Sequence, residues 1–134
     1  MTLRNNPFLS LYTNYFSAYR KEIPDDTLFL SIARLQPKSF RFKTFDKLCP
    51  PAQLLWDYKD GRITWETYEK EYKTQVLDTL VPSEIVAELV ELAGDSKRVC
   101  LLCLEKSEEH CHRRLVMEWL NEYAEELEYR KYYE

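Results

Sequence analysis

The residues best suited to chemistry lie between Val99 and Arg114. The reactive or charged side chains of this segment belong to Cys100, Cys103, Glu105, Lys106, Glu108, Glu109, His110, Cys111, His112, Arg113 and Arg114. Thiols and imidazoles act as nucleophiles, proton carriers or metal ligands, whereas guanidiniums bind phosphate and carboxylate groups through paired hydrogen bonds. The residue types of this segment therefore predict a site for catalysis or for anion binding.

A buried strand and a helix are expected to position these side chains. The short apolar run 98–104 lies between a turn signal and a charged segment, a pattern typical of a strand buried on both faces. Ser107 followed by two glutamates is typical of a helix N-terminus, and apolar residues then recur at four-residue steps from Cys111 to Leu127. Cys111, His112 and Arg113 therefore fall near a helix N-terminus just beyond a strand, where open α/β sheets usually bind ligands.

The rest of the chain alternates predicted strands with predicted helices. The predicted strands span 8–12 and 27–32, and the predicted helical segments span 15–21 (a short helix or turn), 50–57, 64–80 and 84–92. Pro50 and Pro51 suit a first helical turn, Thr64 can cap a helix, and Gly94 can end one. This order predicts an α/β fold of Rossmann-like type, a small three-layer structure in which helices flank a parallel or mixed sheet. We expect one domain over residues 1–134.

Composition favours an ordinary globular chain. Residues 1–7 lack the apolar core of a signal peptide, and the longest apolar run is far shorter than the ~20 residues that cross a bilayer. We therefore expect a cytoplasmic protein without a membrane partner, in which the four cysteines are more often free thiols than disulfides. The chain has two glycines and neither a Walker motif nor a dinucleotide fingerprint, which argues against a glycine-rich phosphate loop.

A basic segment rich in phenylalanine follows the second predicted strand. Between positions 34 and 47 the charged residues are Arg34, Lys38, Arg41, Lys43 and Lys47 against Asp46, with Phe40, Phe42 and Phe45 between them. Basic and aromatic side chains together suit contacts with phosphates and bases. The simpler interpretation, which we favour, is a solvated loop whose phenylalanines cover the core.

Two motifs carry a resemblance to a known family. The first is Arg34-Leu35-Gln36-Pro37-Lys38-Ser39, and the second combines Cys103-Leu104-Glu105 with Cys111-His112-Arg113. In these residues the chain resembles the family called domain of unknown function 488, and the resemblance spans nearly the whole sequence. It implies a compact α/β fold with a shared site, and it implies no particular reaction.

The two motifs are expected to meet in space. Cys103 and Glu105 point to the same side of a strand, and Arg34 follows the carboxyl end of another strand. If these strands are parallel and close, Arg34, Cys103, Glu105, His112 and Arg113 converge on one rim. Two guanidiniums would attract a phosphate or carboxylate there, or Glu105 would orient one of them through a salt bridge.

Two kinds of function fit this cluster, and a third class would not use it. The one we favour is binding of a phosphate-bearing ligand, a nucleotide or a nucleic acid, by Arg34, Ser39 and Arg113. The alternative is a thiol-dependent enzyme acting on such a ligand, with catalytic residues drawn from Cys103, Glu105, Cys111 and His112. A protein-interaction domain that uses the acidic, tyrosine-rich C-terminal end is a third class. The sequence assigns no cofactor and no oligomeric state.

Other motifs in the segment carry less weight. A metal-binding domain, with a zinc site of Cys103, Cys111, a histidine and Glu105, is a further alternative. It lacks the paired motifs of most zinc proteins, and ligation by adjacent Cys and His is awkward, so we assign no metal ligands. Cys100 and Cys103 have redox spacing, but within a strand they face opposite sides. His110-Cys111 lacks the arginine six positions after the thiol that cysteine phosphatases need, because Met117 stands there.

Overall fold

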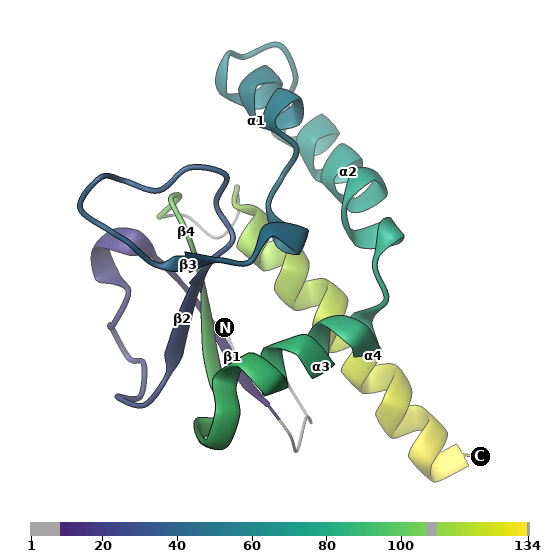
Figure 1. The fold of residues 1–134 in the computed structure, drawn as a ribbon. Helices are drawn as coiled ribbons and strands as arrows, with labels where there is room; N and C mark the ends of the chain where they lie inside the picture. The colour runs from purple at the N-terminus through teal and green to yellow at the C-terminus, as the bar shows by residue number, and fades with distance from the viewer. Residues whose placement is uncertain (1–8, 107–109, 134) are drawn as a thin grey trace.

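The computed structural model describes residues 9–106 and 110–133. The strands are β1 (Ser10–Tyr15), β2 (Leu28–Ser31), β3 (Lys43–Thr44) and β4 (Arg98–Cys103). The helices are α1 (Ala52–Lys59), α2 (Trp65–Gln75), α3 (Pro82–Ala93) and α4 (His112–Tyr133), with short 3-10 turns at Phe16–Ala18, Asp46–Leu48, Leu77–Thr79 and Gly94–Ser96. The predicted α/β fold with a sheet flanked by helices is confirmed (Figure 1).

The four strands form one parallel sheet in the order β1-β4-β2-β3. β4 pairs with β1 and β2, so that Cys103 lies opposite Tyr15 and Leu102 lies opposite Ser31. Residues 99–103 of β4 are all buried, which confirms the prediction of a strand buried on both faces. Because the strands are parallel, their carboxyl ends share one edge, and the chain leaves β2 and β4 side by side.

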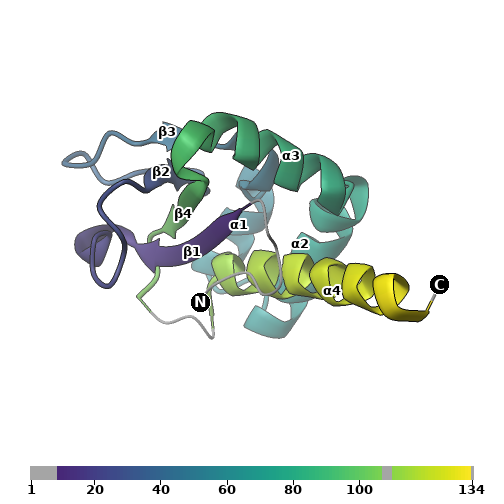
Figure 2. The same cartoon turned by 90° about the horizontal axis from the view of Figure 1, so that it is seen from below.

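The helices α3 and α4 cover one face of the sheet, whereas the other face carries aromatic side chains in place of the second helical layer of the predicted three-layer structure. α3 and α4 pack against each other and against β4 (Figure 2). The opposite side carries an aromatic cluster whose rings lie 5.0–6.1 Å apart, formed by Phe16, Tyr19, Phe29, Phe40 and Phe42. Lys38, Arg41 and Lys43 are exposed beside it. The prediction that phenylalanines of the basic segment cover the core is therefore confirmed.

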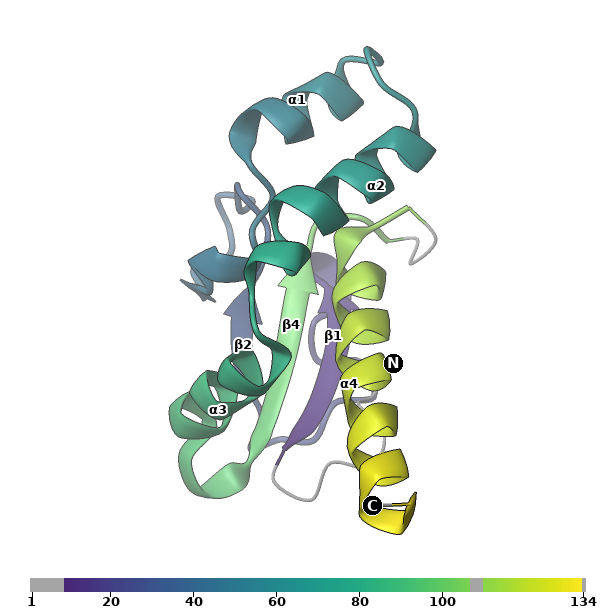
Figure 3. The same cartoon turned by 90° about the vertical axis from the view of Figure 1, so that its right-hand side faces the viewer.

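A hairpin of α1 and α2 lies beyond the carboxyl edge of the sheet (Figure 3). Gly61, with φ of +77°, lies in the turn between the helices, and Oγ1 of Thr64 accepts a hydrogen bond from the N–H of Thr67 to cap α2. The Tyr72 hydroxyl donates to the carbonyl oxygen of Leu48 at 2.6 Å, which ties α2 to the segment before α1. This contact helps to hold the hairpin above the carboxyl ends of β2 and β4.

Apart from shifts of one or two residues at element ends, three differences from the sequence predictions matter for the fold. β1 extends to Tyr15, beyond the predicted end at residue 12, because its polar residues Thr13 and Asn14 also pair with β4. β3 was not predicted, since two residues inside a basic segment give too short a signal. α2 ends at Gln75 rather than at residue 80, because the apolar spacing continues into a 3-10 turn in which Thr79 Oγ1 donates to the Val76 carbonyl at 2.7 Å.

The segment expected to begin the last helix is only partly described. α4 begins at His112, and the predicted cap at Ser107 with Glu108 and Glu109 lies outside the described residues, as does Phe8 of the first predicted strand. None of the helices in residues 9–106 and 110–133 has the length and apolar character needed to cross a bilayer.

Candidate functional site

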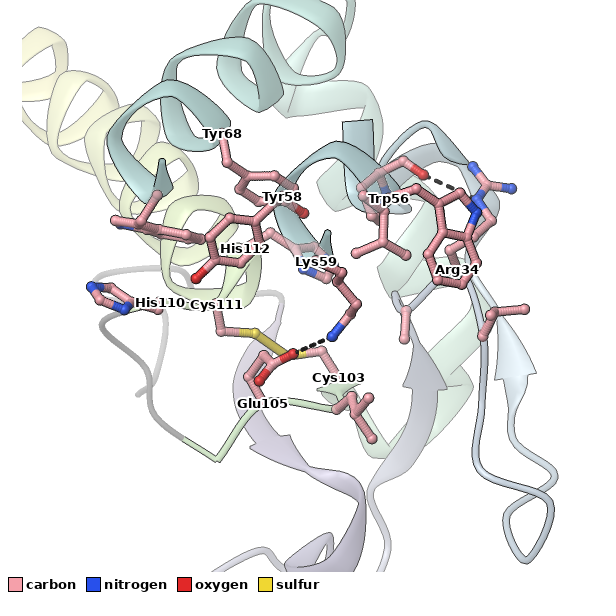
Figure 4. A pocket seen from close by; sticks show the side chains of 16 residues that line it. Arg34, Trp56, Tyr58, Lys59, Tyr68, Cys103, Glu105, His110, Cys111 and His112 are labelled. Carbon is pink, nitrogen blue, oxygen red and sulfur yellow. Dashed lines mark hydrogen bonds and ion pairs between the residues drawn. A yellow bond between two sulfur atoms is a disulfide. The ribbon is translucent and has the colours of Figure 1, made fainter. Parts of the chain in front are cut away.

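A cavity of about 250 Å³ opens at the carboxyl edge of β2 and β4, beneath the α1–α2 hairpin (Figure 4). Aromatic rings of the hairpin form its walls: Trp56, Tyr58, Trp65 and Tyr68. The lining also includes residues from the two sequence motifs, namely Arg34, Cys103, Glu105, Cys111 and His112. The cavity is mainly apolar inside, and its charged side chains lie near the opening.

Two cysteines form the floor of the cavity. Cys103 is the last residue of β4 and Cys111 directly precedes α4, and their sulfur atoms are joined in a disulfide. Both residues are at most 2% exposed. This corrects the expectation of free thiols, because the end of β4 and the residue before α4 lie next to each other.

The other two cysteines are free and lie apart from the cavity lining. Burial raises the pKa of Cys49 to about 11 and that of Cys100 to about 12. The prediction that Cys100 does not pair with Cys103 is confirmed. Both thiols remain protonated at neutral pH and act as packing residues.

His112 opens α4 and faces the cavity from its buried side. Nε2 lies 2.7 Å from the carbonyl oxygen of Ile32, just after β2, so this nitrogen carries the ring proton and donates it. Burial lowers the pKa of His112 to about 4, although the hydrogen bond to Ile32 opposes this shift. The ring is therefore neutral at physiological pH, and Nδ1 is left as an acceptor or ligand atom.

Arg113 is buried behind the floor and does not line the cavity. Its guanidinium donates to the carbonyl oxygens of Glu105 and Lys106 and, at 3.6 Å, to Sγ of Cys103. It also lies 5.8 Å from the centre of the Tyr15 ring. Arg113 thus shapes the segment that follows β4 and places a positive charge beside the sulfur of Cys103.

Arg34 and Lys59 bring positive charge to the opening. Nε of Arg34 donates to the carbonyl oxygen of Pro50 at 3.0 Å, which holds the exposed guanidinium at the rim. Nζ of Lys59 lies 2.9 Å from Oε1 of Glu105, so an ion pair joins α1 to the segment after β4 (Figure 4). Among the described contacts, the carboxylate of Glu105 pairs with Lys59 and not with Arg34 or Arg113, the arginines that the sequence suggested.

The structure brings five of the seven predicted site residues to the cavity: Arg34, Cys103, Glu105, Cys111 and His112. Arg113 contacts the same sulfur from behind. Ser39 is exposed in the loop after β2 and is not among the lining residues. The prediction that two guanidiniums lie on one rim is therefore wrong, because Arg34 lines the cavity and Arg113 does not. The second cation of the lining is Lys59.

Sequence reasoning missed the aromatic walls. Trp65 and Tyr68 lie in the segment 64–80 that was predicted to be a helix, and both are buried, but they also face the cavity. Trp65 stacks on His110 at 5.2 Å, and Tyr58 lies 5.0 Å from Tyr68. Burial raises the pKa of Tyr68 well above its ordinary value, so its phenol stays neutral. The density of aromatic residues in two consecutive helices was the signal that could have revealed the walls.

Comparison with known proteins gives one match. A family model described as "Active DUF488-N3 subclade", DUF488 being domain of unknown function 488, matches residues 12–124, a range that includes both sequence motifs. No curated protein and no solved structure matches the chain.

Proposed function

Because the chain belongs to the domain of unknown function 488 family, and because Arg34, Cys103 and His112 of its motifs border one cavity, we propose that this cavity binds a small phosphate-bearing ligand such as a nucleotide. The observation that carries the proposal is the combination of aromatic walls with cations at the opening. Each part suits a different part of such a ligand.

The aromatic walls suit a flat ring. Tyr58, Trp65 and Tyr68 offer ring faces within one apolar cavity. Stacking of a base on an aromatic side chain contributes about 1–3 kcal/mol and tolerates any base, because every base has a π face. The volume of about 250 Å³ is close to the lower limit of roughly 300 Å³ for small-molecule sites. The cavity therefore suits one nucleotide, or one unstacked base of a nucleic acid, rather than a duplex.

The cations at the opening suit the phosphate. The guanidinium of Arg34 is held at the rim through Nε, and paired hydrogen bonds from guanidinium to phosphate are among the strongest in proteins. Lys59 is within reach of the same opening, where an anionic ligand competes with Glu105 for its ammonium group. Binding is therefore expected to weaken as ionic strength rises.

The test is a calorimetric titration with nucleoside monophosphates, the matching nucleosides, inorganic phosphate and a short single-stranded oligonucleotide. We expect the monophosphate to bind more tightly than its nucleoside and than phosphate alone. Arg34→Ala should lower the affinity roughly 10- to 100-fold, which corresponds to the ~1.5–3 kcal/mol of a hydrogen bond to a charged group. Arg41→Ala is the matched control, since Arg41 is exposed in the same loop but does not line the cavity. Equal affinities for the two variants, or no binding to any probe, would contradict the proposal.

One observation favours a second function, a thiol-dependent enzyme acting on the bound ligand. The Arg113 guanidinium donates to the sulfur of Cys103 at the cavity floor, and a cation in that position favours the thiolate over the thiol. Reduction of the disulfide by a dithiol supplies the two electrons and two protons that free Cys103 and Cys111. Neutral His112 is then the candidate base, because its ring nitrogen lies within 4.8 Å of both sulfurs.

Alkylation rates test this second function. In the reduced protein, iodoacetamide should modify Cys103 or Cys111 at least tenfold faster than Cys49 near neutral pH, as read by peptide mass spectrometry. Cys49 is the internal control, because its buried thiol has a raised pKa. Equal, slow modification of all of these thiols would rule out an activated nucleophile.

A further inference from the structure

We propose that Cys103 and Cys111, once reduced, form with His112 a binding site for a zinc ion at the floor of the cavity. This site goes beyond the proposed function, because it needs no nucleotide and uses none of the cations at the opening. It is also the alternative to a free catalytic thiolate, since a sulfur bound to zinc is not available as a nucleophile.

The donor atoms are already gathered. The two sulfurs and one ring nitrogen of His112 all lie within 4.8 Å of one another, and all three side chains are buried. Zinc takes thiolate sulfur at ~2.3 Å and imidazole nitrogen at ~2.0–2.1 Å in tetrahedral geometry, which sets its ligand atoms roughly 3.5–4 Å apart. Zinc therefore requires the two sulfurs to separate, while the nitrogen needs only a small adjustment.

The backbone leaves room for that separation. The Cα atoms of Cys103 and Cys111 lie 7.6 Å apart, whereas most disulfides hold their Cα atoms ~4.4–6.8 Å apart. An ion placed between the two sulfurs suits this wider spacing. The residues can thus serve as ligands without bringing β4 and α4 closer together.

His112 is oriented as metal-ligating histidines usually are. Its Nε2–H donates to the carbonyl oxygen of Ile32, which fixes the ring and leaves Nδ1 with its lone pair. Metal-binding histidines commonly donate their second ring N–H to a backbone carbonyl or a carboxylate in this way. The hydrogen bond from Arg113 to Cys103 adds a donor to one of the two sulfurs.

Among the residues that the structure describes, three protein ligands are gathered, and they leave the fourth position of the ion open. Cys103, Cys111 and His112 all line the cavity, so this position faces the space in which a ligand would bind. Glu105 also lines it, but its carboxylate is paired with Lys59. Structural zinc sites have four protein ligands, whereas sites that bind water or substrate have three. The geometry is therefore that of an open site.

Formation of the site can be written as a balanced sequence. A dithiol reduces the Cys103–Cys111 disulfide and is itself oxidised to a disulfide, which leaves two protein thiols. Zinc then binds both sulfurs and releases their two protons. Two thiolates balance the charge of the divalent ion, so no buried carboxylate is required.

The test uses the full-length chain, reduced with a dithiol, freed of reductant without oxygen and titrated with Co²⁺ as a spectroscopic probe. We expect one Co²⁺ per chain, with the thiolate charge-transfer and tetrahedral ligand-field absorption that Zn²⁺ then removes. Oxidised protein should show neither band until it is reduced. The same reduced protein without any such absorption would overturn the proposal, and this comparison needs no variant.

Variants identify the ligands. We expect a loss of Co²⁺ affinity of more than about 100-fold in each of Cys103→Ser, Cys111→Ser and His112→Ala. Removing a residue that only hydrogen-bonds to a metal ligand already lowers metal affinity roughly 10- to 100-fold. Cys49→Ser and Cys100→Ser are matched controls that remove buried free thiols outside the cavity lining, and they should bind as the unaltered chain does. Unchanged Co²⁺ affinity in His112→Ala would refute this set of ligands. Circular dichroism shows whether a variant that no longer binds Co²⁺ is still folded. Because the titration contains no nucleotide, its failure would leave the proposed ligand binding standing.

Discussion

Replacing Arg113 should destabilise the protein more than replacing its neighbour Arg114, although the described contacts of Arg114 include two ion pairs with carboxylates. Arg114 bonds to Glu69 and Glu118 at 3.0 and 2.7 Å, but its side chain is about a quarter exposed. Arg113 is 2% exposed, and its described contacts include two backbone carbonyl oxygens and a sulfur. The two variants therefore test whether burial or ion pairing determines how much an arginine contributes to the free energy of unfolding.

The expected magnitudes follow from the environment of each guanidinium. Hydrogen bonds from a charged group contribute ~1.5–3 kcal/mol each, so losing those to the carbonyls of Glu105 and Lys106 should cost roughly 3–6 kcal/mol. Removing the guanidinium also removes the penalty for burying its charge, which places the result near the lower end, about 3 kcal/mol. Ion pairs near the surface contribute ~0–1 kcal/mol each, so losing the two described pairs in Arg114→Met should cost about 2 kcal/mol or less.

Urea unfolding followed by circular dichroism at 25 °C measures both variants. We expect Arg113→Met to lower the free energy of unfolding by about 3 kcal/mol with an unchanged slope against urea. Arg113→Lys should recover only part of this loss, because one ammonium group cannot reproduce the planar guanidinium that spans both carbonyls. If Arg114→Met costs as much as Arg113→Met, the assignment of Arg113 as the residue that holds the segment after β4 is wrong.

Three further predictions concern single side chains. Tyr72→Phe should lower the free energy of unfolding by about 1–3 kcal/mol, measured by urea, because it leaves the buried carbonyl of Leu48 without its phenol donor. In the oxidised, metal-free protein His112 has a pKa of about 4, below the ordinary 6.5, so the unfolded chain binds more protons between these values. The free energy of unfolding should therefore be unaffected by protonation of His112 above pH 6.5 and should fall by up to ~1.4 kcal/mol per pH unit between pH 6.5 and pH 4. Urea unfolding at a series of pH values measures this loss, and His112→Gln should lack it. Lys59→Ala should weaken nucleotide binding in calorimetry but lower the free energy of unfolding by less than about 1 kcal/mol. The control is Lys47→Ala, which removes another exposed ion pair, away from the cavity. It should change neither the binding nor the stability measurably.

The broad fold could be predicted because its signals are local. The apolar run 98–104 and the caps at Thr64 and Gly94 each specify an element from neighbouring residues. The two-residue β3 was missed, although the alternation Phe40-Arg41-Phe42-Lys43, which runs into its first residue, is a weak strand signal. β1 was predicted too short, since its polar end is a strand only through pairing with β4.

The meeting of the two motifs follows from a general rule, whereas the orientation of each side chain does not. Parallel strands share an edge, and this places Arg34 near Cys103 without any knowledge of side chains. Whether a residue at the start of α4 faces the cavity depends on where the helix begins, so His112 and Arg113, adjacent in sequence, have different surroundings. The aromatic walls were hidden because Trp65 serves both the core and the cavity.

The most direct measurement of the central claim is a crystal structure of the chain with a nucleoside monophosphate that carries bromine on its base. The anomalous signal of bromine locates the ring without reference to the protein model. The account predicts a peak inside the cavity, between the rings of the α1–α2 hairpin, with the phosphate within hydrogen-bonding distance of Arg34. A bromine peak elsewhere on the molecule, at a ligand concentration that saturates binding in solution, would contradict it.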